Sequence, residues 1–435
     1  MEKGIWKFVA GLLFLFLVLV GFFSGCAKKK EAGVITLRWV SDPNPLRKEQ
    51  IERFEKVNPG IKVNLDWSSG GMEKILTQTA GGNPPDLFDC YTPEQLRIFA
   101  KKGAVLDVTD YCKRDNVNLR DIIWPQCDDY IYYQGRVYSI PTNAGTFVLF
   151  YNKKIFDKEG IPYPDDTWTW DKFLEIAKKL TKINPEKKYY EYFGTGINNL
   201  ENFLPWQYGV DFYSPDGKKC VSNSEEYKEA FRFIYDLRYK YHVTPTAAET
   251  ENIGSSVSGW GQGEQNLFAS QKLAMLFYGR WGIITMRKIK DLEWGIAPVP
   301  YPTRGKRVTL FISRSTLISS KTKYPEEAFK FLKFLLSKDY NETIAQGGDS
   351  IPAVISLCKS DFFLKDPAYP KETQNQIYID AVSYSRPTRL SPYFNELEVE
   401  RIKKDEIDKM WAGIQKPDET LDNITQRVNL LSREK

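Results

Sequence analysis

The segment over residues 34–91 constrains the fold more than any other part of the chain, because strand and helix patterns alternate through it. Apolar strand patterns occur in VITLRWV, in IKVNLDW and in LFDCY. Between them lie a helix with Ile51, Phe54 and Val57 on one face, which ends at NPG, and a second helix around residues 72–79, which ends at GGNPPD. Such β-α-β-α-β segments wind right-handed into a mostly parallel sheet, and ligands bind beyond the carboxyl ends of its strands.

Strand and helix patterns keep alternating over the rest of the chain, which predicts the α/β class. In TWTWDKFLEIAKKL, Thr169 can cap a helix whose positive end Asp171 complements. In YPEEAFKFLKFLLSK, Pro325 suits the first turn of another helix, and KLAMLFYGRW predicts a buried strand over residues 273–277. About 410 residues follow residue 25, which is enough for two or three domains or one large two-lobed domain.

The amino terminus has the pattern of an export signal. Two lysines precede an uncharged run that ends in SGC, and KKK follows it. The small residues before Cys26 resemble the lipobox of bacterial lipoproteins, with Phe23 where that family usually has leucine. We therefore expect a signal peptide over residues 1–25, lipid attachment at Cys26 and a polar tether over residues 26–33, with an uncleaved membrane anchor as the alternative. Either arrangement places the remaining chain outside the cytoplasm and tethers it to the cell membrane.

Composition argues against several classes of partner and site. The net charge of +5 is spread along the chain, so we expect no nucleic-acid partner, which would need a concentrated basic face. The chain has one histidine, His242, and no C-x-x-C pair, so we expect neither a metal nor a cofactor. Cys112 and Cys127 could form a disulfide in an oxidising compartment, but we expect the cysteines beyond residue 26 to be buried free thiols.

A series of segments along the chain resembles one known family. In order they are NPGIKV, GGNPPDLF, YSIPTNAGTFVLFYNKKIFDKEGI, TWTWDKF, LPWQYGVDFYSPDG, KLAMLFYGRWG, WGIAPVPYP, LISSKTKYPEEAFKFLKFL and GGDSIPA. They resemble the extracellular solute-binding proteins of sugar ABC importers, the group related to maltose-binding protein. The resemblance implies two α/β lobes, joined by several crossing segments, with a ligand cleft between them. We assign residues 34–142 and 312–352 to lobe 1, and residues 143–311 and 353–435 to lobe 2.

The function implied by the resemblance is binding without catalysis. A monomeric, lipid-anchored receptor would capture a sugar or oligosaccharide and deliver it to the membrane permease of an ABC importer. One alternative is a secreted glycoside hydrolase, which needs two carboxylates about 5 to 9.5 Å apart across the scissile bond. Another is a binding protein for a different solute, such as a polyamine or a peptide.

Candidate ligand residues follow from the chemistry of a pyranose. Aromatic rings suit its apolar faces, and amide or charged side chains suit its hydroxyl groups. Such residues gather at predicted strand ends and in segments that resemble cleft segments of the family: Ser41, Asp42, Asp89, Tyr91, Asn202, Trp206, Gln207, Tyr208, Tyr278, Arg280 and Trp281. Trp281 matches the position of a stacking tryptophan of the family, and Arg280, where the family often has proline, could instead indicate an acidic ligand.

Further candidates lie at the presumed crossing segments and in a glycine-rich loop. They are Asn143 with Thr146, Asp349 with Ser350, and Trp260 in SGWGQGEQ. Each candidate also has a purely structural interpretation. Ser41 and Asp42 could cap a turn, Trp206 could belong to a helix core, and Trp260 could be exposed without a ligand.

Overall fold

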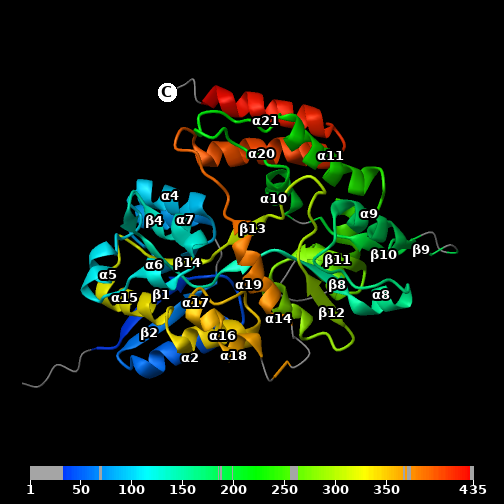
Figure 1. Cartoon of the computed structure of the whole chain (residues 1–435). Coiled ribbons are helices and arrows are strands. Elements are labelled where there is room, and N and C mark those ends of the chain that lie inside the picture. Colours follow the sequence, from blue (N-terminus) through cyan, green and yellow to red (C-terminus); the bar gives the residue numbers. More distant parts are fainter. Residues whose placement is uncertain are drawn as a thin grey trace, which may run out of the picture.

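The computed structural model describes residues 33–431 except residues 68–70, 185, 187–188, 198, 255–262, 366–367 and 370–373. Within residues 251–254 only the backbone is described. The predicted signal peptide and Cys26 therefore lie outside the described residues, as does Trp260. Two α/β bodies lie side by side beneath a layer of helices (Figure 1). No helix in the described part of the chain has the length and apolar composition needed to cross a membrane.

The first body is built on a five-stranded sheet in the order β2-β1-β3-β14-β6. Its strands are β1 (Ile35–Val40), β2 (Ile61–Asp66), β3 (Leu87–Cys90), β6 (Ser139–Pro141) and β14 (Ser315–Ile318). Strand β1 is parallel to β2 and β3, which confirms the predicted β-α-β-α-β segment, whereas β14 is antiparallel to β3 and β6. Its longer helices are α2 (Leu46–Val57), α3 (Met72–Ala80), α4 (Pro93–Lys101), α15 (Pro325–Phe334) and α16 (Lys338–Gly347).

The second body contains a mixed sheet in the order β12-β8-β11-β10-β9. Its strands are β8 (Val148–Asn152), β9 (Lys182–Ile183), β10 (Tyr190–Thr195), β11 (Leu273–Tyr278) and β12 (Trp294–Ala297). Strand β8 is antiparallel to β11 and β12, and β10 is parallel to β11. Helix α9 (Trp170–Lys179) packs on β10 and begins where predicted, because the Thr169 hydroxyl accepts a hydrogen bond from the backbone N–H of Lys172.

Several segments cross between the two bodies and pair with one another. A three-stranded sheet joins β7 (Gly145–Thr146), β13 (Thr309–Ile312) and β15 (Ser385–Arg386), and the backbone of Ala144 bridges to Ile351. The strands of each main sheet fall within the corresponding predicted lobe. Helices α17 (Ile355–Cys358) and α18 (Asp361–Leu364), which follow residue 353, pack against α16. The predicted lobe boundaries themselves remain predictions.

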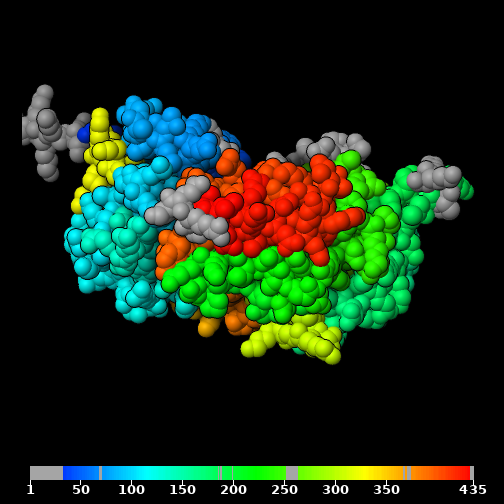
Figure 2. All heavy atoms as spheres, turned by 90° about the horizontal axis from the view of Figure 1, so that it is seen from above, coloured from blue at the N-terminus to red at the C-terminus, as the bar shows by residue number. Residues whose placement is uncertain are grey.

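The helical layer has its own small core and covers the second body. It comprises α10 (Leu200–Gln207), α11 (Glu225–Tyr239), α20 (Glu396–Trp411) and α21 (Pro417–Leu431). Phe231, Ile402 and Leu421 are buried between its helices. Seen from above, the orange and red atoms of α20 and α21 lie between the blue residues of the first body and the green residues of the second (Figure 2). The last two helices of the chain thus return over the junction of the two bodies.

Short elements complete the fold. They are α5 (Thr109–Arg114), α6 (Leu119–Ile122), η1 (Pro125–Cys127), α7 (Asp128–Ile131), β4 (Tyr132–Tyr133), β5 (Arg136–Val137), α8 (Lys153–Lys158), α12 (Ala247–Gly254), α13 (Glu264–Ala269), η2 (Arg280–Gly282), α14 (Ile283–Met286) and α19 (Gln376–Ser383). The five cysteines of the described chain are buried free thiols, so Cys112 and Cys127 do not form a disulfide.

Candidate functional site

A cavity of about 420 Å³, here called the cleft cavity, lies between the first body and the helical layer. Its wall on the first body comes from α3, the end of β3 and α4, and includes Met72, Tyr91 and Gln95. The opposite wall and floor come from α10, β13, the segment after β15 and α20, and include Asn199, Asn202, Leu310, Ile312, Thr388 and Lys403. Ligand sites are usually cavities of this size at the junction of two domains.

A smaller recess of about 80 Å³ adjoins the cleft cavity at the carboxyl ends of β1 and β3. It is lined by Ser41, Asp42, Asp89 and Tyr91, which the sequence placed in the site, and it shares Tyr91 with the cleft cavity. The ring of Tyr91 is 40% exposed, and its hydroxyl donates to Asp42 Oδ2 at 3.3 Å. The strand-end rule therefore brings these four residues together in space.

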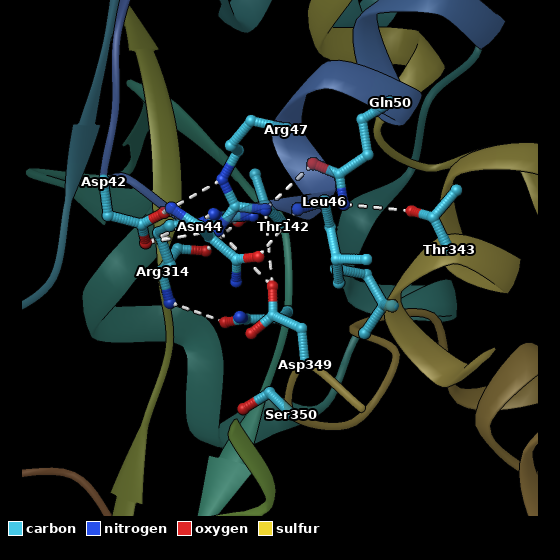
Figure 3. A network of polar contacts seen from close by, with 12 residues as sticks. Asp42, Asn44, Leu46, Arg47, Gln50, Thr142, Arg314, Thr343, Asp349 and Ser350 are labelled. Atoms are coloured by element: carbon cyan, nitrogen blue, oxygen red, sulfur yellow. Dashed lines mark hydrogen bonds and ion pairs between the residues drawn. The ribbon is translucent and has the colours of Figure 1, made fainter. Parts of the chain in front are cut away.

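At the recess, two arginines and three aspartates form a largely buried charge network, and Figure 3 shows four of its members, Arg47, Arg314, Asp42 and Asp349. Arg47 of α2 lies 2.9 Å from Asp42 and 3.3 Å from Asp349. Arg314, next to β13, lies 3.5 Å from Asp42 and 3.6 Å from Asp89. Burial of an ion is costly unless opposite charges and hydrogen bonds compensate it, and here each aspartate faces an arginine. The network therefore ties the strand ends of the first body to a crossing segment.

Asp89 is held in place by three hydrogen bonds from neutral side chains. It accepts hydrogen bonds from Trp39 Nε1 at 2.9 Å, from Ser41 Oγ at 2.5 Å and from Thr316 Oγ1 at 2.7 Å. Burial raises the pKa of Asp89 to about 6, although the charge of Arg47 opposes this effect. Burial also raises the pKa of Asp349, which is 2% exposed. Asp89 thus lines the recess as a buried side chain, Asp349 lies outside its lining, and Asp42 remains the carboxylate of this set closest to solvent.

The predicted segment NFLPWQYG divides between the cleft and the core. Asn202 lines the cleft cavity, and its amide donates to Asn199 Oδ1 at 3.0 Å. Gln207 is 1% exposed and is fully engaged, because it accepts from Trp170 Nε1 and donates to the carbonyls of Pro300 and Val308. A ligand cannot reach a side chain in that position, so we do not retain Gln207 as a ligand residue.

The aromatic residues beside Asn202 also differ in position. Trp206 is 9% exposed and packs against the guanidinium of Arg386, 4.1 Å from its ring centroid. Tyr208 is half-buried against the core of the second body and does not line the cleft cavity. Of the four predicted residues in this segment, Asn202 alone reaches the cleft cavity.

Arg280 lies in the protein interior and not in the cleft cavity. It is 1% exposed and donates hydrogen bonds to the carbonyls of Ile344, Ala345 and Ser350 and to Asn375 Oδ1. The guanidinium thereby fastens the second body to the last turns of α16 and to the loop that follows it. Because its donors serve the backbone, its position gives no support to an acidic ligand.

Trp281 of η2 packs against the core of the second body. Its half-buried ring packs edge-on against Phe147 with centroids 5.3 Å apart, and it lies over Gly279, where an added Cβ would stand 1.7 Å from the ring. A Cβ added at Gly145 would meet both this ring and Ile312, which lines the cleft cavity. Neither Trp281 nor its neighbour Tyr278 lines the cleft cavity, although Trp281 shares Gly145 as a neighbour with Ile312, which does. The hydroxyl of Tyr278 donates to Gln265 at 2.8 Å.

The candidates at the crossing segments have structural partners. Asn143 is 8% exposed and accepts from the backbone N–H of Arg314 at 3.0 Å, and Thr146 donates to the carbonyl of Tyr378 at 3.2 Å. Ser350 is buried with a positive φ of 60°. These residues hold the crossing segments in register with one another.

Several cleft residues were missed in the sequence. Glu94 begins α4 just after β3, so the strand-end rule could have found it. Thr388, Glu400 and Lys403 come from the carboxyl-terminal part of the chain, and no local pattern links them to the cleft. Lys403 Nζ pairs with Glu400 at 2.8 Å. Burial lowers the pKa of Lys403, but Glu400 and Glu94 outweigh this effect, so its pKa is raised.

The arrangement suits reversible binding of a polar molecule. The cleft cavity combines a partly exposed tyrosine ring with hydroxyl, amide, carboxylate and ammonium groups. Within the described ranges, no group of three or more His, Cys, Asp or Glu side chains could hold a metal ion. The adjacent pairs Asp128–Asp129 and Asp165–Asp166, which the hydrolase alternative could use, do not line the cleft cavity.

Comparison with known proteins gives one family. The model of the bacterial extracellular solute-binding proteins matches residues 40–342. A putative binding protein of Brucella abortus is 25% identical over 379 residues, which cover 83% of this chain and 84% of that protein. The sn-glycerol-3-phosphate-binding periplasmic protein UgpB of Escherichia coli is 24% identical over 419 residues, covering 91% and 92%. An ABC substrate-binding protein of Listeria monocytogenes in complex with cycloalternan superposes with a TM-score of 0.78 at 25% identity, covering 91% and 98%.

Proposed function

Because this chain belongs to the bacterial extracellular solute-binding proteins, we propose that it is the receptor of an ABC importer that captures a sugar or oligosaccharide. The observation that carries this proposal is the cleft cavity, which lies where crossing strands join two α/β bodies. Lobes joined in this way can close on a ligand and exchange its solvent contacts for contacts on both sides. The loaded, closed receptor then delivers the solute to the membrane permease.

The ligand-binding residues that we propose come from both sides of the cleft. Tyr91 offers a partly exposed ring for the apolar face of a pyranose, and Asp42 beside it can accept hydrogen bonds from sugar hydroxyls. From the opposite side, Asn202 and Lys403 offer an amide and an ammonium group. Trp281 lies behind Gly145 and outside the lining of the cleft cavity, and we propose that its ring supplies a second aromatic surface in the ligand-bound form.

A carbohydrate fits the cleft better than an anionic solute does. The Listeria protein is described in complex with cycloalternan, which supports a saccharide, whereas UgpB is described as binding sn-glycerol-3-phosphate. A phosphate would need several donors without competing carboxylates. Here the single lysine of the cleft pairs with Glu400, and Glu94 and Glu396 line the same cavity.

The location that we propose follows from the amino-terminal pattern. Lipid attachment at Cys26 and removal of residues 1–25 would leave a monomeric receptor tethered outside the cytoplasm by a short polar segment. Such a receptor needs no catalytic residues, since the permease takes up the sugar intact.

A thermal-shift screen tests this function. The soluble chain from Lys28 onward is mixed with monosaccharides and with malto-, cello-, xylo- and manno-oligosaccharides, and the sugars are recovered and analysed afterwards. We expect at least one sugar class to raise the Tm, because a ligand that binds the folded state alone stabilises it, and we expect every sugar to be recovered uncleaved. Release of new reducing ends would favour the hydrolase, and a rise in Tm with sn-glycerol 3-phosphate alone would favour an anionic solute.

A further inference from the structure

A second cavity of about 250 Å³, here called the inner chamber, lies behind the cleft cavity and beneath α20. Its walls come from α10, α11, α20, α21 and the segments that precede α11 and α20. Six residues line both cavities: Glu94, Asn202, Thr388, Glu396, Glu400 and Lys403. The two spaces therefore border each other along these six side chains.

The inner chamber has the aromatic surface that a sugar ring requires. Trp206, Phe212 and Tyr213 line it, together with Tyr227 and Phe231. Phe212 is half-buried and faces the ammonium group of Lys403, which lies 5.3 Å from its ring centroid. The predicted cleft residue Trp206 thus lines the chamber and not the cleft cavity itself.

Charge in the inner chamber is predominantly negative. Six carboxylates and three basic side chains line it. Glu396 pairs with Arg97 at 2.8 Å and Asp211 pairs with Arg386 at 2.9 Å, both through arginines that lie outside the lining. Glu94, Glu201 and Glu400 remain around Lys403, which pairs directly with Glu400. Burial raises the pKa of both Glu94 and Glu201, as expected for carboxylates whose surroundings do not fully compensate their charge.

We propose that the inner chamber is a subsite for the terminal unit of an oligosaccharide, and that this unit carries no negative charge. This inference rests on the proposed function and adds to it the length of the ligand and the charge of its end. The aromatic walls contact the ring, and the carboxylates accept hydrogen bonds from its hydroxyl or amino groups. An anionic end group would meet like charges in a space with little solvent, which is unfavourable.

Filling the chamber tests the length of the ligand. Ile407 of α20 is half-buried and lines the inner chamber but not the cleft cavity, so Ile407→Trp places a large ring in the chamber, and Ile407→Val serves as the matched control. Calorimetric Kd values are measured for sugars of one to six units from the series that binds. In the unmodified protein and in Ile407→Val, we expect the Kd to fall at least about tenfold with length. In Ile407→Trp, the ratio of the Kd for short sugars to the Kd for long sugars should approach one.

The charge of the end group is tested separately, which keeps the inference falsifiable if Ile407→Trp does not fold. The longest binding sugar is compared with the same sugar oxidised to the aldonic acid, in the unmodified protein and in Glu201→Gln. We expect the oxidised sugar to bind at least about tenfold more weakly, and Glu201→Gln to reduce this difference. Two outcomes would contradict the assignment of the inner chamber as a subsite while leaving the proposed function intact. One is equal Kd values for the neutral and the oxidised sugar. The other is a ratio of short-sugar to long-sugar Kd that is unchanged in Ile407→Trp. If no sugar binds, both proposals fail.

Discussion

Arg97 of α4 and Glu396 at the start of α20 form an ion pair across the cleft, with Nη1 and Oε1 2.8 Å apart. The side chains are 22% and 5% exposed, and Arg97 also donates to the carbonyl of Ser391 at 3.0 Å. One partner belongs to the first body and the other to the helical layer, which packs on the second body. Any motion that opens the cleft at this point must separate them.

We predict that Arg97→Ala shifts the protein toward an open form and weakens sugar binding by about tenfold, because it leaves the carboxylate of Glu396 with only the more distant Lys101 at 3.9 Å. Small-angle X-ray scattering measures the opening as a larger radius of gyration, and calorimetry measures the affinity. Lys113→Ala, which removes an exposed ion pair with Asp110, is the control. The charge-reversed pair Arg97→Glu with Glu396→Arg should recover part of the affinity, and an unchanged scattering profile in Arg97→Ala would contradict this role.

The charge network predicts a pH effect on stability that is centred on Asp89. Its folded-state pKa, about 6, lies above the ordinary aspartate value of 3.8, so the folded state binds more protons than the unfolded state between these pH values. This group therefore contributes to a loss of stability as pH rises from about 4 to about 6, by about 1 to 3 kcal/mol, and it has no further effect above that range. Urea unfolding of the unmodified protein and of Asp89→Asn between pH 4 and 7 isolates the contribution. Parallel curves for the two proteins would show that Asp89 does not titrate in this way.

Arg280 is predicted to stabilise the fold and not to recognise the ligand. Arg280→Ala leaves buried backbone carbonyls without their donor, which should lower the free energy of unfolding by about 2 to 4 kcal/mol. Arg280→Lys should restore part of that loss. Urea denaturation measures both variants. A variant that keeps its stability but loses sugar affinity would instead place this guanidinium at the ligand.

Trp281→Ala should weaken sugar binding at least about tenfold, or about 1.4 kcal/mol, because the bound sugar loses the aromatic contact that we propose for this ring. The ring also packs on Phe147, so the free energy of unfolding is measured alongside the Kd. Trp294→Ala is the control, since Trp294 is a half-buried tryptophan on the edge strand β12 that lines a different cavity. An unchanged Kd in Trp281→Ala would remove this residue from the proposed site.

Local patterns predicted the parts of the fold that local interactions determine. The alternating strands β1, β2 and β3, the Thr169 cap and the strand β11 all follow from side-chain periodicity or from hydrogen bonds over a few residues. The strand-end rule also selected Asp42 and Tyr91, which line the same recess, although their role in ligand binding remains a prediction. These features depend on neighbours in the sequence or on one sheet edge.

Long-range packing determines what the sequence did not reveal. Lys403 reaches the cleft because α20 returns over it after some 300 residues from Tyr91, and nothing near Lys403 in the sequence indicates this. Arg280 and Gln207 are residue types that could bind a sugar. Their side chains instead donate hydrogen bonds to backbone carbonyls of segments that are distant in the sequence. The sequence thus shows which strand ends carry polar side chains. Tertiary packing then determines whether each of these side chains faces the cleft or the protein core.

Isothermal titration calorimetry of the soluble protein with the neutral oligosaccharide that raises its Tm most tests the central claim directly. A receptor that closes on an intact sugar should give a saturating one-to-one isotherm, and Tyr91→Ala should weaken that binding at least about tenfold. A sustained heat of turnover, or an isotherm unaffected by Tyr91→Ala, would contradict a non-catalytic sugar site in this cleft.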